Sequence, residues 1–144
     1  MRVGVILASH GEFARAALGS AEMVVGPQDD VRALGLGALT SLEEFEAAFG
    51  DAYDRLAATC DLVVVLCDIL GGTPFNVVCR AKAQARPMLA YTGLSLPVLI
   101  ELLVCRGQYA TEQEVAAAIE ASASAALSRI EVAPPAALDE EDEL

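Results

Sequence analysis

The sequence predicts an α/β protein in which a mainly parallel sheet lies between two layers of helices. Short apolar runs rich in β-branched residues are continuous rather than alternating, as in strands that helices cover on both faces. Stretches with helical periodicity separate these runs, and such alternation implies parallel strands. The length of 144 residues suits one domain, and the 55% of hydrophobic residues excludes a disordered chain.

Four apolar segments are predicted to be strands. Val3 to Ala8, Asp61 to Cys67 and the shorter Met88 to Tyr91 are continuous runs, and Val31 to Leu36 is a weaker run expected nearer an edge. We expect the strand order 2-1-3-4, a flavodoxin-like arrangement in which the first and third strands are neighbours. Arg129 to Val132 is a candidate for a short final strand, antiparallel at an edge of the sheet.

Five segments between and after the strands are predicted to be helices. Two of them begin with capping boxes, formed by Ser41 with Glu44 and by Thr111 with Glu114. Thr73 is the expected N-cap of another, because a proline follows it at the first helical position. The predicted helices cover Glu12 to Val25, Ser41 to Leu56, Thr73 to Ala85, Ser95 to Cys105, and Thr111 to about Ser128.

The chain is strongly acidic, with a formal net charge of -12 from 9 Lys+Arg against 21 Asp+Glu. It therefore offers little basic surface for nucleic acid or for an anionic membrane. No apolar run reaches the ~18 residues of a membrane span, and no clear cleavage site follows the first apolar run, so we expect a cytoplasmic location. The folded domain is expected to cover residues 1–133, and the acidic residues 134–144 are expected to be a mobile tail.

No cofactor or metal site is expected. The chain has one histidine and no C-x-x-C pair, so its cysteines are expected to be free thiols in a reducing compartment. A P-loop is absent, and Gly35-Leu36-Gly37 lacks the third glycine of a dinucleotide-binding loop. The four cysteines are Cys60, Cys67, Cys79 and Cys105.

The candidate catalytic residues follow two strands that are expected to be neighbours. Ligand sites in open parallel sheets lie at the carboxyl ends of strands, where the strand order reverses. His10, the only histidine, follows the first strand, and Asp68 follows the third, so the two are expected to face each other. A carboxylate there would fix the tautomer of the imidazole and leave its other nitrogen as a nucleophile. The alternatives are a surface histidine and a loop-capping aspartate.

A glycine-rich turn after Asp68 is the candidate phosphate site. Gly71 and Gly72 allow a close backbone approach, and the unpaired N–H groups of the helix that begins at Thr73 attract anions. Ser9 and Gly11, which flank His10, are counted with these residues as phosphate-binding. The alternative is a plain tight turn. A nucleophilic histidine, an orienting carboxylate and an anion-binding helix start suit reversible phosphoryl transfer.

Three segments of the chain resemble the IIA domains of the mannose-type (mannose/fructose/sorbose) bacterial phosphotransferase system. The segments are Val3 to Gly11, Thr92 to Leu103 and Asp68-Ile-Leu-Gly-Gly-Thr-Pro-Phe-Asn76, and the last of them is the most specific. The similarity spans roughly residues 1 to 130. The resemblance implies that His10 accepts a phosphoryl group from phospho-HPr and passes it to a histidine of a IIB component. It implies also that Asp68 is the partner acid and that Thr73 places a hydroxyl beside the phosphate.

A homodimer is expected on two grounds. The resemblance implies one, and the helix after the fourth strand carries more apolar side chains than a single core face needs, which is typical of an interface. An edge strand formed by Arg129 to Val132 across the pair is one way to join the copies. The apolar side chains are Leu94, Leu96, Val98, Leu99, Leu102 and Leu103.

Two other functions remain open from the sequence. Many relatives of the mannose type carry a fused IIB domain after a linker, whereas this chain ends in an acidic stretch. A regulatory module, whose His10 phosphorylation state controls a partner protein and which serves no transporter, is therefore the first alternative. A flavodoxin-like domain that binds a small ligand, with an incidental histidine, is the second, because the fold by itself does not specify function.

Overall fold

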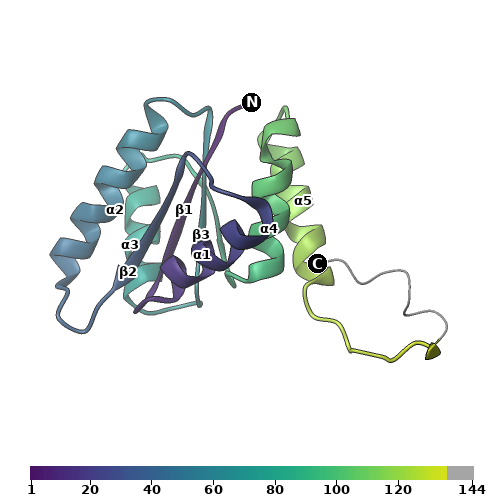
Figure 1. Cartoon of the computed structure of the whole chain (residues 1–144). Helices are drawn as coiled ribbons and strands as arrows, with labels where there is room; N and C mark the ends of the chain where they lie inside the picture. The colour runs from purple at the N-terminus through teal and green to yellow at the C-terminus, as the bar shows by residue number, and fades with distance from the viewer. Residues whose placement is uncertain (136–144) are drawn as a thin grey trace.

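Four parallel strands form one sheet between two layers of helices, in a computed structural model that describes residues 1–135 (Figure 1). The strand order is β2-β1-β3-β4, and each strand runs parallel to its neighbours. The strands are β1 (Val3–His10), β2 (Val31–Leu36), β3 (Leu62–Cys67) and β4 (Leu89–Thr92). The helices are α1 (Phe13–Val25), α2 (Leu42–Ala57), α3 (Thr73–Ala83), α4 (Leu96–Cys105), the 3-10 turn η1 (Arg106–Gln108) and α5 (Glu112–Ala125).

The sheet buries side chains on both faces, which explains the continuous apolar runs. Successive side chains of a strand point to opposite faces. Val5 and Leu7 of β1 therefore join the core under α1, α4 and α5, while Ile6 and Ala8 join the core under α2 and α3. Figure 1 shows α2 and α3 on one side of the sheet and α4 and α5 on the other. Within residues 1–135 no helix is long and apolar enough to cross a membrane.

The predicted strand order and parallel sheet are confirmed, and two local predictions are wrong. Gly72, not Thr73, is the N-cap of α3, because its φ of 86° and ψ of 176° provide the turn into the helix. The segment Arg129 to Val132 forms no strand, and its Ile130 and Val132 are exposed. After α5 this segment runs away from the sheet, so it meets no strand edge of its own chain (Figure 1). Most of the predicted acidic tail, residues 136–144, lies outside the described residues.

The apolar side chains of α4 are used inside the molecule. Leu99 is fully buried, and Leu94, Val98, Leu102 and Leu103 are also buried in the core under α1 and α5. Of the six side chains cited for a dimer, only Leu96 is exposed. The apolar content of α4 is therefore weak evidence for the expected dimer, because most of its apolar residues are buried inside the chain and only Leu96 and Val104 are exposed on this helix.

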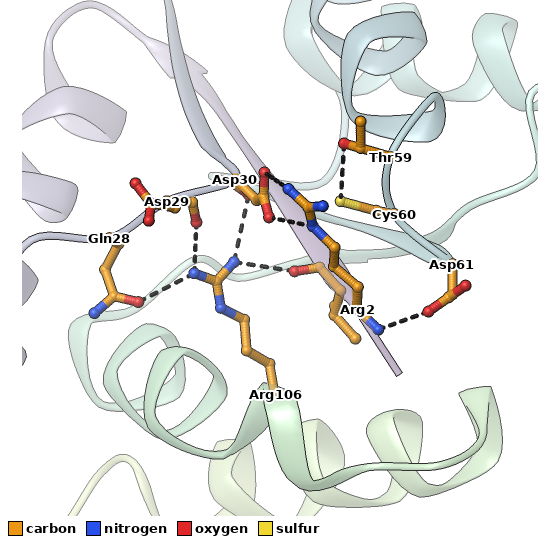
Figure 2. A network of polar contacts seen from close by, with 9 residues as sticks. Arg2, Gln28, Asp29, Asp30, Thr59, Cys60, Asp61 and Arg106 are labelled. Atoms are coloured by element: carbon orange, nitrogen blue, oxygen red, sulfur yellow. Dashed lines mark hydrogen bonds and ion pairs between the residues drawn. The ribbon is translucent and has the colours of Figure 1, made fainter.

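An arginine network holds the amino ends of the strands together (Figure 2). The Arg106 guanidinium, at the end of α4, donates to the carbonyl oxygens of Val3 at 3.0 Å, Asp29 at 2.6 Å and Asp30 at 3.4 Å, and to the Gln28 side chain at 3.1 Å. Beside it, both carboxylate oxygens of Asp30 accept hydrogen bonds from the side chain of Arg2. Arg106 thus ties α4 to β1 and to the turn that precedes β2.

We predict that Arg106→Met destabilises the protein by about 2–3 kcal/mol, because it removes charged donors from several backbone carbonyls at once. Urea unfolding would measure the loss. Arg55→Met is the matched control: Arg55 makes only an exposed pair with Asp51 one helical turn away, so its loss should cost less than about 0.5 kcal/mol. Equal effects of the two substitutions would contradict the structural role of Arg106.

Candidate active site at the carboxyl ends of the strands

His10 and Asp68 meet where β1 and β3 end. His10 is the last residue of β1 and the only exposed one in that strand. Its backbone N–H donates to Asp68 Oδ2 at 2.9 Å, and its ring Nδ1 lies 2.8 Å from the same oxygen. A carboxylate only accepts hydrogen bonds, so Nδ1 carries a proton, and in the neutral imidazole Nε2 then keeps its lone pair. Because the His10 side chain is 47% exposed, this second nitrogen lies within reach of a partner.

The Asp68 carboxylate is held on both of its oxygens. Oδ2 binds His10 twice, and Oδ1 accepts a hydrogen bond from the Ile69 backbone N–H at 2.9 Å and one from the Cys67 thiol at 3.6 Å. Burial acts to raise the pKa of Asp68, but the hydrogen bonds from His10 and Ile69 outweigh it, and the pKa lies below its ordinary value. Asp68 is therefore ionised at neutral pH and rigidly placed behind the imidazole.

The thiol of Cys67 serves this carboxylate as a donor. Cys67 is buried, and burial together with the nearby Asp68 charge raises the pKa of its thiol to about 11. The thiol thus stays protonated and can donate to Oδ1. The sequence does not predict the two donors to Oδ1. The Ile69 backbone N–H leaves no signal in the sequence, and the position of Cys67 at the end of a buried strand predicts only a buried free thiol.

The start of α3 lies against the free side of the imidazole. A Cβ atom built on Gly72 would lie 3.1 Å from His10 Cε1 and 3.2 Å from Nε2, so the backbone approaches the ring as closely as glycine allows. Gly71 and Gly72 both have left-handed φ angles, 81° and 86°. Among the residues that the structure describes, no side chain caps this end of α3. Its first N–H groups and the positive end of its dipole are therefore available beside Nε2.

The Thr73 hydroxyl is free because the N-cap of α3 is Gly72, one residue before the predicted N-cap. Because Gly72 is the N-cap, Thr73 is the first helical residue. Within the described part of the chain, its hydroxyl makes no hydrogen bond with another protein group. This hydroxyl and the adjacent N–H groups form a set of donors that no internal acceptor uses.

Ser9 and Gly11 lie on either side of His10 and hold the strand end in place. Ser9 is fully buried, and its hydroxyl accepts a hydrogen bond from the Ala14 backbone N–H at 2.7 Å, which caps the start of α1. Gly11 has a φ of 53°, and its N–H donates to the Leu36 carbonyl oxygen of β2 at 2.8 Å. The Ser9 side chain is thus buried against the start of α1, and it is not exposed beside the imidazole to meet a phosphate.

The larger cavities lie elsewhere. One of about 500 Å³ lies at the far end of β3, lined by Cys60, Arg86 and Met88 among others, and one of about 560 Å³ lies over the acidic outer face of α2. Neither includes His10 or Asp68, so neither supports a small-ligand function for this pair. Residues 1–135 contain no group of three or more His, Cys, Asp or Glu side chains placed to hold a metal ion, and the four cysteines are free thiols.

Comparison with known proteins assigns the family. Residues 4–120 match the EIIA-man family model, described as "PTS system fructose IIA component". The chain is 32% identical over 108 residues to the PTS system fructose-specific EIIA component of Bacillus subtilis. The aligned residues cover 72% of this chain and 70% of that protein. It is 30% identical over 125 residues to the mannose-specific EIIAB component of Escherichia coli, covering 83% of this chain but only 37% of that longer protein.

A solved structure agrees with these matches. The mannose/sorbose-specific IIA subunit from Enterococcus faecalis superimposes with a TM-score of 0.81 at 28% sequence identity, over 93% of this chain and 98% of that one. The family match over residues 4–120 contains β2, β3 and β4, all of β1 except Val3, and also His10, Asp68 and the start of α3. The chain belongs to the mannose/fructose/sorbose family of phosphotransferase-system IIA components, which are phosphoryl-transfer proteins.

Proposed function

We propose that the chain is a cytoplasmic phosphoryl carrier for sugar uptake that accepts phosphate from phospho-HPr on His10 and delivers it to a IIB component. One observation carries the proposal: the proton of His10 is held on Nδ1 by Asp68, while Nε2 faces outward beside the uncapped start of α3. A histidine arranged in this way is a nucleophile with a fixed direction of attack.

The proposed transfer needs no group beyond these residues and the two partner proteins. The Nε2 lone pair attacks phosphorus, the N–P bond to the donor histidine breaks, and that electron pair returns to the donor ring. Positive charge develops on the His10 imidazole and is offset by the Asp68 carboxylate 2.8 Å away. The phosphoryl oxygens are expected to accept hydrogen bonds from the α3 start, through the Thr73 hydroxyl and the backbone around Gly71 and Gly72. Delivery to the IIB histidine is the same step in reverse.

A regulatory role would use the same chemistry with a different recipient. A IIB component that takes the phosphoryl group from His10 would identify the uptake function, while a regulator whose activity follows the His10 phosphorylation state would identify the alternative. We favour uptake because the two relatives compared above are a fructose-specific and a mannose-specific component.

The proposed acceptor is tested by His10→Ala. We expect the wild-type chain, incubated with phosphoenolpyruvate, enzyme I and HPr, to gain the mass of one phosphoryl group, and His10→Ala to gain none while keeping its circular dichroism spectrum. The reason is that His10 is the only histidine. Intact mass spectrometry checks this result, and an acid-labile adduct on His10→Ala would refute the assignment.

Asp68→Asn tests the proposed orienting group. We expect transfer from phospho-HPr to slow by roughly 10²-fold or more, since orienting groups of this kind contribute about 10²–10⁴-fold. The amide keeps the shape of the side chain but loses its charge, and it can select the wrong imidazole tautomer. Binding of HPr should change little, because Asp68 lies behind the ring. Single-turnover kinetics measures the rate, and a wild-type rate would show that Asp68 is only a loop cap.

We also propose a homodimer, and its support comes from the edge strand β4 and from the segment after α5 instead of from α4. Within residues 1–135, β4 is an edge strand that pairs with β3 alone, so the backbone groups on its other side meet no strand of this part of the chain. The segment after α5 carries Ile130 and Val132, which are 93% and 85% exposed and alternate with polar Arg129 and Glu131. Such a segment suits pairing with β4 of a second copy.

For the dimer, we expect light scattering at micromolar concentration to give twice the chain mass for the wild type. The double substitution Ile130→Lys with Val132→Lys should give a monomer, because charges replace the apolar face. Glu131→Gln removes a negative charge at the same place, on the other face of the segment, and should leave the dimer intact. A monomeric wild type would rule out this proposal.

A further inference from the structure

The sheet fixes the backbone of Asp68, so only its side-chain torsions can change the direction of the carboxylate. The Asp68 N–H donates to the Ala8 carbonyl of β1 at 3.0 Å, and the Asp68 carbonyl accepts from the Gly93 N–H at 3.3 Å. Hydrogen bonds on both sides leave the main chain little freedom at this residue. The donors to the two carboxylate oxygens are therefore what holds the side chain against rotation.

The thiol of Cys67 is one of the two donors to Oδ1, the oxygen that does not bind His10. The Ile69 N–H donates to Oδ1 at 2.9 Å, and the Cys67 sulfur lies 3.6 Å from it, a hydrogen-bonding distance for the larger sulfur atom. The same sulfur lies 3.8 Å from the Ile69 carbonyl oxygen. A thiol has a single proton, and the charged oxygen is both nearer and the stronger acceptor, so the proton points to Asp68.

Nothing in the surroundings of Cys67 can easily replace this donor. Its side chain is 2% exposed, and its residue pairs with Ala8 of β1 on one side and with Thr92 of β4 on the other. The small cavity that it borders, of about 140 Å³, has the apolar side chains of Phe75 and Val78 in its lining. Without the thiol proton, Oδ1 would keep only the Ile69 N–H.

We propose that Cys67 is a positioning residue for phosphoryl transfer, whose thiol holds the Asp68 carboxylate in the direction that keeps the His10 ring ready to attack. The inference rests on the proposed function of His10. Cys67 touches no reacting atom and undergoes no chemical change. Its contribution reaches the ring through Asp68 alone, because Oδ1 and Oδ2 belong to one planar group and turn together.

The thiol also has an opposing effect on the carboxylate. A donor to Oδ1 withdraws some negative charge, which weakens the hydrogen bond to Nδ1 and the compensation of positive charge on the ring. Position outweighs this effect for a physical reason. The carboxylate keeps its unit charge with or without the thiol, whereas a hydrogen bond weakens steeply once rotation takes it out of line. Removing the thiol should therefore slow the transfer.

The test separates the donor from the volume of the side chain. Cys67→Ala and Cys67→Val both remove the donor, one with loss of volume and the other without, and Cys67→Ser supplies a hydroxyl donor in place of the thiol. Cys79→Ala is the matched control, because Cys79 is an exposed thiol on α3 that lines the same small cavity. Each variant is phosphorylated in single-turnover experiments with phospho-HPr and, separately, with phosphoramidate.

We expect Cys67→Ala and Cys67→Val to slow phosphorylation by both donors roughly 3-fold to 10-fold, the range of one hydrogen bond. The loss should lie in the rate at saturating donor and not in KM, since Cys67 lies behind the imidazole. Cys67→Ser and Cys79→Ala should match the wild type.

The pKa of Asp68 is the second readout, followed by the carboxyl carbon signal that Asp68→Asn lacks. A donor to the charged form lowers a carboxyl pKa. The pKa of Asp68 should therefore rise in Cys67→Ala and Cys67→Val and stay low in Cys67→Ser. A change in packing alone would alter Cys67→Ser and Cys67→Ala alike.

Three outcomes would overturn the positioning role. They are transfer by both Cys67→Ala and Cys67→Val at the wild-type rate, faster transfer by these variants, which would show that charge withdrawal outweighs position, and a loss in Cys67→Ser equal to that in Cys67→Ala. If Cys67→Ala does not fold, Cys67→Val and Cys67→Ser decide between these results. Failure of phospho-HPr to label the wild type would refute the proposed donor, and the comparison with phosphoramidate would still test Cys67.

Discussion

The Asp68 carboxylate holds His10 by both its backbone and its ring, and the geometry of the site depends on this double contact. Through Oδ2 it fixes the strand end and the tautomer together. Through Oδ1 it is itself fixed by the Ile69 N–H and the Cys67 thiol. An imidazole restrained in this way loses little further freedom when a partner approaches, which favours a reaction that depends on positioning.

The parallel sheet is what makes this contact available. Asp68 N–H donates to the Ala8 carbonyl, so the ladder between β1 and β3 continues to the first residue beyond β3. The two connections then leave the sheet side by side at the point where the strand order reverses.

The sequence allowed the sheet and the proximity of His10 to Asp68 to be predicted, because both depend on strong signals. Runs such as Leu62 to Cys67 are fully apolar, and polar residues follow them at once. The predicted N-cap at Thr73 was off by one, since a glycine N-cap has no side-chain signature. The expected dimer interface on α4 is a weaker prediction for another reason: composition does not reveal whether Leu99 or Leu102 packs inside its own chain or against another, and both are buried inside this one.

The paired left-handed glycines at the start of α3 limit which sequences this site can accept. Gly71 and Gly72 adopt backbone conformations that cost other residues about 1–3 kcal/mol each. At Gly72 the first side-chain carbon would also press on the imidazole. Any side chain is therefore strained at these two positions, whatever its polarity or volume. Mutational drift in the family should therefore be slowest at two residues that have no side chain with which to react.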